Sequence, residues 1–468
     1  MDCLVDSYDE DQLVKQLEKE LKNSKRKDSD SEKLDAETKA KLQAAVHDKQ
    51  MLADKDGEIH RVAEIDYIIK DILKHQDKAF KKKRDMEDSR EVVECSKGEE
   101  NSTLEDKDFI RSDDASLAYT NEEVIANQRG VTFYLIKKIG VNLLSGKSIM
   151  NISLPIKIFE SRSILEKAAE SFSLVPYYFL KALEEKDPIG RMRILITCYI
   201  SSLQLEPQML KPFNPILGET FQAIMGEYEI ALEQISHHPP ILAVQMWSNT
   251  IKNAPSLSGY VEFEAKTGLR TIDITKKGEI KVYFPDSGQT VISHTFPDAV
   301  MHGVVKGTRT YDFLNSMKLS DEENQIYADV VFNPDKKGWL KRMFTSSQKT
   351  HHDHFEGIIS NSKDLDYKNG RGGDIEKLKK SSGLEVYSKI EGNWTESMKI
   401  DDKIVWEYSK YKPLKVRYIN NPLPSDCRFR TDLIALLNND FVKAQEQKDE
   451  LEDLQRQDKK LRKEAGHH

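Results

Sequence analysis

Alternation of apolar and charged residues in the second half of the chain constrains its fold most. In YVEFEA, residues 260–265, Val261 and Phe263 alternate with two glutamates. EIKVYF ends at the turn sequence PDSG, and IYADVVF ends at NP. Successive side chains of a strand point to opposite faces, so these segments predict strands with one buried and one solvated face. A long antiparallel sheet of such strands either packs on another layer or closes around an interior that can hold a ligand.

Composition divides the rest of the 468-residue chain. The first part is dominated by charged and amide residues with short apolar stripes, which predicts a helical or coiled-coil arm over 1–96. Such an arm is typical both of a partner-binding segment and of a helix solvated all round. We predict a disordered linker over 97–121 and a main domain over 122–468, because aromatic, Gly and Pro residues become frequent there.

Helical patterns flank the predicted strands. The segment from Ser163 to Leu205 carries apolar stripes at helical spacing and predicts the helices of a compact domain. At the other end, a turn-rich stretch precedes a highly charged helix over Ala435–Ala465, within a C-terminal helical section of about 423–465.

Charge and cysteine content exclude several classes of protein. The net charge of −8 provides no global basic field, so we expect no nucleic-acid partner. Four scattered cysteines without CxxC spacing suit a reducing compartment and no zinc module, which favours a cytoplasmic location. The N-terminal sequence lacks the basic start and apolar run of a signal peptide. The most apolar segment, Val131–Met150, contains Lys137 and Lys138 near its middle and is not expected to span a membrane.

The loop KPFNPILGETF, Lys211–Phe221, is a candidate anion site. Its two prolines enforce a bent, extended path. Lys211 offers a compact positive charge and Asn214 an amide, and both can bind a phosphate. Read alone, the stretch favours an ordinary surface lysine at Lys211 over a phosphate ligand.

The octet EQISHHPP, residues 233–240, places two histidines before two prolines. In a regular strand His237 and His238 would point to opposite faces and could not share a ligand. Proline restricts its own backbone and that of the preceding residue, so a stiff corner is expected that offers both imidazoles side by side. A solvated loop is the alternative interpretation of the same pattern.

The C-terminal helix carries a third candidate in KDELEDLQR. Lys448, Glu452 and Arg456 recur every four residues and therefore share one helix face, where the glutamate can order the two cations. Exposed charge ladders of this kind are also common on surface helices.

Enzyme motifs do not account for these residues. THHDHF, Thr350–Phe355, matches no metal-ligand spacing, and the chain has no GxSxG elbow, P-loop or dinucleotide fingerprint. A hydrolase using His237 or His238 as a base would need a nucleophile, for which no motif is present. We therefore predict no catalytic residue, no metal site and no cofactor.

Together, KPFNPILGETF, EQISHHPP and KDELEDLQR resemble the oxysterol-binding protein family, from about Gly130 to Arg456. The resemblance implies an α+β, mainly β fold. Its core would be a nearly closed antiparallel β-barrel that encloses an apolar lipid tunnel, with flanking helices, an N-terminal lid and a charged C-terminal helix. The chain has SDCR, Ser425–Arg428, where the family usually has TDSR, and no pleckstrin-homology domain is expected before the barrel.

The resemblance also implies a function. Family members bind phosphatidylinositol 4-phosphate and a second lipid, a sterol or phosphatidylserine, in one tunnel and exchange them between membranes. The residues carried over for the phosphoinositide headgroup are Lys211, Asn214, His237, His238, Lys448, Glu452 and Arg456. We expect Glu452 to hold Lys448 and Arg456 in place, and we expect a cytoplasmic protein that binds membrane contact sites peripherally and transiently.

The lid is expected over about 122–146. Its apolar residues recur near every four positions, so the helix could close the tunnel, rest on a membrane or simply pack on the core; they are Val131, Leu135, Ile139 and Leu143. EDKDFIRSDDA, around Phe109, is a candidate tether to the endoplasmic reticulum, although Ile110 and Arg111 depart from the family's motif.

Two further functions stay open at this point. One is a lipid sensor that signals through the N-terminal arm without net transfer. The other is an enzyme in which His237 or His238 removes the phosphate of a phosphoinositide. The second lipid is not identified, and Tyr199 and Gln204 are candidate polar contacts for it.

Overall fold

The computed structural model describes residues 109–112, 116–139, 153–208, 210–268, 270–333, 352–363, 384–408 and 410–464. The chain divides into two compact units, and all of these residues belong to the second, Glu100–His468. The predicted arm, 1–96, lies outside the described residues, as does Leu143 of the predicted lid. Leu135 and Ile139 lie in a described helix, but their side chains do not belong to the described part.

One antiparallel sheet of 16 strands dominates this unit. The strands of the large sheet are β1 (Phe109–Arg111), β2 (Leu117–Tyr119), β5 (Thr220–Met225), β6 (Tyr228–His237), β7 (Pro240–Trp247), β8 (Ser256–Thr267), β9 (Thr271–Tyr283), β10 (Thr290–Thr295), β11 (Asp298–His302), β12 (Thr310–Asp321), β13 (Ile326–Phe332), β14 (His354–Ser360), β15 (Val386–Asn393), β16 (Ser397–Ile400), β17 (Lys403–Glu407) and β18 (Arg417–Tyr418). A separate parallel pair is formed by β3 (Phe159–Ser163) and β4 (Lys211–Phe213).

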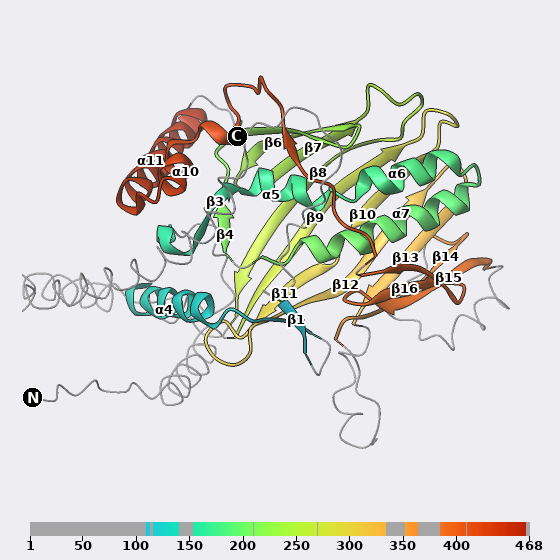
Figure 1. Cartoon of the computed structure of the whole chain (residues 1–468), viewed down its shortest axis with the longest axis horizontal. Helices are drawn as coiled ribbons and strands as arrows, with labels where there is room; N and C mark the ends of the chain where they lie inside the picture. Colours follow the sequence, from blue (N-terminus) through green and yellow to red (C-terminus); the bar gives the residue numbers. More distant parts are fainter. Residues whose placement is uncertain are drawn as a thin grey trace, which may run out of the picture. The chain divides into compact units, whose positions relative to one another are not determined.

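Helices precede and follow the long strands. The α-helices are α4 (Glu122–Ile139), α5 (Ile164–Ser171), α6 (Val175–Glu184), α7 (Pro188–Ser202), α10 (Thr431–Leu437) and α11 (Phe441–Glu464). Short 3₁₀ turns are η2 (Ile156–Ile158), η3 (Leu203–Leu205) and η5 (Cys427–Phe429). Figure 1 shows α6 and α7 side by side across the sheet, and α10 beside α11. The predicted mainly β fold with flanking helices and a charged C-terminal helix is confirmed.

Neighbouring strands of the sheet are mostly joined in sequence order, from β5 to β10 and from β12 to β17. Such connections need only short turns, and Gly226 supplies one between β5 and β6 with a positive φ of 58°. In β9, Gly278 lies so close to the backbone of β8 that a Cβ atom would meet the carbonyl oxygen of Tyr260 at 2.1 Å. Only glycine permits this approach at the point where the longest strand pair lines the interior.

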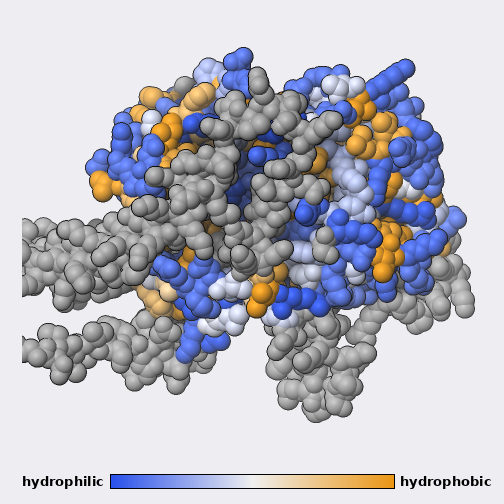
Figure 2. Space-filling view, viewed as in Figure 1, coloured by the Kyte–Doolittle hydropathy of each residue, from blue (hydrophilic) through white to orange (hydrophobic). Residues whose placement is uncertain are grey.

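Apolar residues of the strands and of α5–α7 form one large core, and a second, smaller core joins elements from both ends of the domain. The smaller core contains Ile156, Phe159, Phe213, Ala435, Leu436 and Ala444. It fixes α10 and α11 against β3 and β4, although these elements are far apart in sequence. The face in Figure 2 is mainly hydrophilic, with apolar side chains in small scattered groups.

The predicted disordered linker, 97–121, does not hold for its C-terminal part. Phe109–Arg111 pairs with Leu117–Tyr119, which in turn pairs with β12. All three residues of the second segment are buried. Burial of Leu117 and Tyr119 supplies the apolar contacts that ordering a short segment requires.

The predicted continuous helix over Ala435–Ala465 is also wrong in its first turns. The chain forms α10, breaks, and starts α11 at Phe441. Asn439 in the break has a φ of 59°, a left-handed conformation that asparagine tolerates better than most residues and that no α-helix continues through.

None of the helices in the described ranges is both long and apolar enough to cross a membrane.

Candidate functional site

A cavity of about 720 Å³ opens between the sheet, the helices and α11. Alternate residues of the long strands form its apolar wall, among them Leu257, Val261 and Phe263 of β8 and Ile274 and Ile280 of β9. The inward residues Val261 and Phe263 are those predicted from the alternating sequence. A volume of this size is in the range of pockets that hold small-molecule ligands and cofactors. The polar residues of the cavity come from α11, from β4 and the β6–β7 corner, and from single positions such as Glu264 and Lys276 in the otherwise apolar strands.

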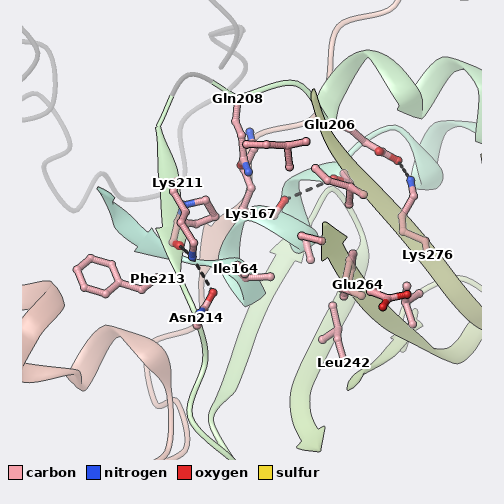
Figure 3. A pocket seen from close by; sticks show the side chains of 18 of the residues that line it. Ile164, Lys167, Glu206, Gln208, Lys211, Phe213, Asn214, Leu242, Glu264 and Lys276 are labelled. Carbon is pink, nitrogen blue, oxygen red and sulfur yellow. Dashed lines mark hydrogen bonds and ion pairs between the residues drawn. The ribbon is translucent and has the colours of Figure 1, made fainter. Parts of the chain in front are cut away.

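Lys211 and Asn214 lie together at the wall of this cavity, on β4 and the residue that follows it (Figure 3). The Lys211 Nζ donates to Asn214 Oδ1 at 2.7 Å and to the Pro212 carbonyl at 3.1 Å. Burial, and to a smaller extent the positive charges of Lys448 and Arg430, lower the pKa of Lys211 to about 7. Lys211 is therefore a cation that gains most from an anion in the cavity.

His237 and His238 line the same cavity at the corner between β6 and β7. The register of β6 against β7 shifts between Gln234 and Ser236, and His238 already belongs to the turn. This irregularity overcomes the opposite facing of neighbouring strand residues. The two ring centroids lie 4.3 Å apart.

Both imidazoles are neutral near pH 7. Burial lowers the pKa of His237 to about 4, assisted by repulsion from His238 when that ring is protonated and by the positive charges of Lys459 and Arg462. Burial and Lys459 also lower the pKa of His238. A neutral imidazole still donates one N–H, so each ring can offer a hydrogen bond to an oxygen.

The charged face of α11 closes the polar end of the cavity. Lys448 is buried, and its Nζ donates to Glu452 Oε1 at 2.6 Å and to Ser153 Oγ at 2.9 Å. Arg456 Nη2 donates to the second oxygen of Glu452 at 3.2 Å. Glu452 thus contacts both cations, in the arrangement expected from their spacing.

All seven residues predicted for the headgroup line this one cavity, although they come from three distant segments. Three carry positive charge or a readily protonated amine, two are neutral imidazoles, one is an amide and one is a carboxylate. Converging cations and N–H donors favour an oxyanion, because charge-assisted hydrogen bonds are stronger than neutral ones. Their role as phosphoinositide ligands stays a prediction.

Arg430 is a residue that the sequence analysis missed. It lines the cavity, and its guanidinium donates to the Asn214 carbonyl at 2.7 Å, to Glu219 at 2.9 Å and to both oxygens of Asp432. Arg430 therefore positions the loop that carries Asn214. Its pairing with Asp432 two residues later was the only local signal.

A second polar group lies in the wall of the cavity (Figure 3). Lys276 of β9 donates to Glu206 at 2.5 Å, and Gln208 lies nearby with a buried Oε1 that has no hydrogen-bond partner in the described structure. Of the two polar contacts predicted for a second lipid, Tyr199 lines the cavity, whereas the Gln204 side chain donates to the Ser201 carbonyl.

The predicted lid coincides in part with α4. Gln128, Val131 and Thr132 line the cavity, so one face of this helix borders the interior. Gln128 accepts from Arg309 at 2.9 Å, which ties α4 to the segment before β12. Closure of the tunnel by this helix stays a prediction.

The candidate tether around Phe109 lies in β1 instead of an open segment. The Phe109 ring contacts that of Tyr119 at a centroid distance of 4.9 Å, and Arg111 pairs with the buried Asp353. Asp353 also accepts from Asn393 and Thr395, so this part of the histidine-rich THHDHF segment holds strands together. The tether itself is untested.

Cys198 is a thiol in the wall of the cavity. Burial raises the pKa of this thiol to about 12, which leaves it a poor nucleophile at neutral pH. Among the described residues, no group of three His, Cys, Asp or Glu is arranged to hold a metal ion.

Comparison with known proteins gives a consistent result. A family model described as oxysterol-binding protein matches residues 140–468. Oxysterol-binding protein 9 of Dictyostelium discoideum is 32% identical over 363 residues, which are 76% of this chain and 82% of that protein. Oxysterol-binding protein-related protein 8 of Mus musculus is 28% identical over 298 residues, or 62% of this chain. The chain spans only 29% of the mouse protein's length.

Solved structures share the fold. The crystal structure of Osh3 ORD from Saccharomyces cerevisiae, in complex with PI(4)P, covers 71% of this chain and 84% of its own, with a TM-score of 0.52 at 22% identity. The Osh1 ORD domain in complex with ergosterol covers 72% of this chain and 80% of its own, with a TM-score of 0.52 at 20% identity. At such identities the similarity extends to the fold alone.

Proposed function

The chain belongs to the oxysterol-binding protein family, and from that premise we propose that it is a lipid-transfer protein for phosphatidylinositol 4-phosphate and a second lipid. The second lipid is a sterol or phosphatidylserine. Each occupies the same tunnel in turn, and the protein exchanges them between membranes without chemical change to either.

One observation carries this proposal: an apolar cavity large enough for a lipid ends at a cluster of cations and N–H donors. Acyl chains or a sterol ring system would fill the apolar part, and the polar cluster would hold a phosphorylated headgroup. The complexes of two proteins with the same fold, Osh3 ORD with PI(4)P and the Osh1 ORD domain with ergosterol, support lipids of these two kinds as ligands.

The charges of the cluster favour a phosphomonoester over a phosphodiester. A monoester carries close to two negative charges at neutral pH, whereas a diester carries one. Lys211, Lys448 and Arg456 supply cations, and Glu452 already neutralises part of the charge of two of them. Protonated Lys211 then gains a counter-ion, which offsets the cost of its burial.

Sharing one tunnel gives exchange a physical basis. Two lipids that cannot be bound together compete, so a membrane rich in one displaces the other. In this proposal the protein is cytoplasmic and reaches membranes peripherally, at contact sites where both donor and acceptor membranes are near.

The test is extraction of phosphatidylinositol 4-phosphate from liposomes by wild type and by the His237→Ala/His238→Ala double variant. We expect wild type to extract the lipid and the double variant to lose about tenfold or more in affinity, because two hydrogen bonds to a charged group are removed. Sterol and phosphatidylserine are added separately as competitors, and the one that displaces the phosphoinositide is the second cargo.

A matched control is the His294→Ala/His354→Ala double variant, which removes two histidines that do not line the cavity. It should extract as wild type does. Failure of folded wild type to extract would contradict the proposal. Binding without transfer between two liposome populations would favour a lipid sensor, and recovery of the lipid without its phosphate would favour an enzyme.

A further inference from the structure

We propose that the headgroup site continues along α11 beyond the predicted ladder, and that Gln455 and Lys459 are two further residues that bind a phosphorylated inositol headgroup. This inference rests on the proposed function and deepens it. Both residues line the same cavity as the histidine pair and Arg456.

Gln455 presents an unused hydrogen-bond donor. Its Nε2 is buried and has no hydrogen-bond partner within the described structure. Buried polar groups are nearly always paired, because an amide that has lost water without gaining a partner destabilises the fold. An oxygen of a bound headgroup would provide the acceptor that the protein itself does not.

Lys459 presents an unused positive charge. It makes no ion pair with any residue of the described structure, whereas its neighbour Lys460 lies 3.9 Å from Glu464. Lys448 and Arg456 share Glu452. Among the described cations of α11 that line the cavity, Lys459 is therefore the one that is not paired with a carboxylate.

The position of Lys459 relative to the histidines supports a shared ligand. Its charge lowers the pKa of both His237 and His238, so its ammonium group lies within electrostatic reach of both rings. The Lys459 ammonium group and the two imidazole N–H groups are all hydrogen-bond donors, so they do not stabilise one another. A phosphate between them would satisfy all three groups.

Helix geometry places the two residues on the face of the predicted ladder. Gln455 follows Glu452 by three residues and precedes Lys459 by four, which is the spacing of side chains on one side of an α-helix. The two roles differ. The Gln455 amide can donate a hydrogen bond to a neutral or a charged oxygen, whereas Lys459 forms an ion pair with the phosphate.

The experiment compares full-length wild type with Gln455→Met, Lys459→Gln and the double variant. Binding of soluble inositol 1,4-bisphosphate, which carries the same phosphate arrangement as the lipid headgroup, is measured by calorimetry, and extraction of phosphatidylinositol 4-phosphate from liposomes is measured in parallel. We expect each single change to weaken binding by about tenfold, the loss of one hydrogen bond or ion pair to a charged ligand.

The dependence of binding on ionic strength distinguishes the hydrogen bond of Gln455 from the ion pair of Lys459. Binding by Lys459→Gln should depend less on ionic strength than binding by wild type, whereas Gln455→Met should keep the wild-type dependence. Lys459→Arg should retain most of the affinity because it keeps the charge. Lys460→Gln is the matched control: it removes the same charge one residue away, from a side chain that does not line the cavity, and should bind as wild type does.

Thermal melts of all variants test for a folding defect. Gln455→Glu is a second variant of nearly unchanged shape, and it should weaken binding more than Gln455→Met because its carboxylate repels the phosphate. Wild type that extracts the lipid together with a double variant of unchanged affinity would overturn this inference and leave the proposed function standing. Wild type that neither extracts the lipid nor binds the soluble headgroup would overturn both.

Discussion

Lys211 is a lysine that the fold keeps partly out of water beside two other positive charges. Phe159 lies beneath its ammonium group at 4.8 Å from the ring centroid, and Asn214 accepts its shortest hydrogen bond. Neither contact supplies a negative charge. The protein without ligand therefore carries a cost at this position that a bound anion removes.

Lys211→Met should stabilise the ligand-free protein and abolish phosphoinositide extraction. The folded-state pKa is about 7, below the ordinary 10.5, so the unfolded chain binds more protons between these values and wild-type stability rises with pH there. The variant's advantage should be largest below pH 7 and disappear above pH 10.5. Thermal melts at several pH values check this, with a shift of about 2–4 °C expected at pH 6.

Lys157→Met is a control at a second lysine whose pKa burial lowers, but which does not line the cavity. It should leave extraction intact. Equal stability of Lys211→Met and wild type at every pH would contradict the account of Lys211 as a buried, uncompensated cation.

At the scale of elements, α4 and α11 both line the same cavity. α11 is fixed by the small core around Phe159 and Phe213 and by Lys448 bonding to Ser153. α4 buries Ile125 in the large core and is otherwise held by polar contacts, from Arg309 to Gln128 and from Arg129 to the carbonyls of Gly303 and Gly307. With a single fully buried apolar residue among those described, α4 has fewer core contacts than α5–α7, which favours it as the element that would move in the proposed lipid exchange.

Val131→Asp should speed the escape of bound lipid. It would place a carboxylate on the face of α4 that lines the cavity, where burial of charge is unfavourable. Transfer of labelled lipid to acceptor liposomes should show dissociation faster by about 3–10-fold. Tyr134→Asp puts the same charge on a side chain that is 55% exposed and should dissociate at the wild-type rate. Equal rates for both variants would remove the lid assignment.

For the whole molecule, the cavity combines a mainly apolar space, whose wall includes the Lys276–Glu206 pair, with the cluster of predicted headgroup residues, and these two parts can be tested separately. The strands contribute the space through alternate residues such as Val261, while β4, the β6–β7 corner and α11 contribute the polar end. Binding of a lipid needs both parts, but binding of a soluble headgroup needs only the second.

Val261→Trp should fill the apolar space and prevent extraction of phosphatidylinositol 4-phosphate and of its competitor, while inositol 1,4-bisphosphate still binds with wild-type affinity. Val261 is buried in the large core but also lines the cavity, which offers room for the added ring, so we expect a stability loss of about 1–3 kcal/mol. Tyr260→Trp, on the outer face and 47% exposed, is the control. Extraction by Val261→Trp at the wild-type level would mean that lipids do not enter this cavity.

Several features of the fold and site were predictable because they depend on short-range spacing. Alternation around Val261 predicted strands with a buried face, and the recurrence of Lys448, Glu452 and Arg456 predicted a shared helix face. Local propensity was insufficient where a single residue or a distant surface decides the outcome. Asn439 interrupts the last helix, and Leu117 and Tyr119 form a strand only because β12 offers them an edge.

By itself the sequence determined the strand pattern, the family motifs and hence the seven candidate headgroup residues. Only the tertiary structure decided that Arg430 supports Asn214, that Lys276 pairs with Glu206 inside the tunnel, and that Gln455 has a buried donor without a partner. The same holds for the pKa of Lys211, which depends on its burial and on Lys448 and Arg430. Motifs and periodicity follow from neighbours in the chain, whereas burial, charge state and unpaired groups follow from which distant segments pack together.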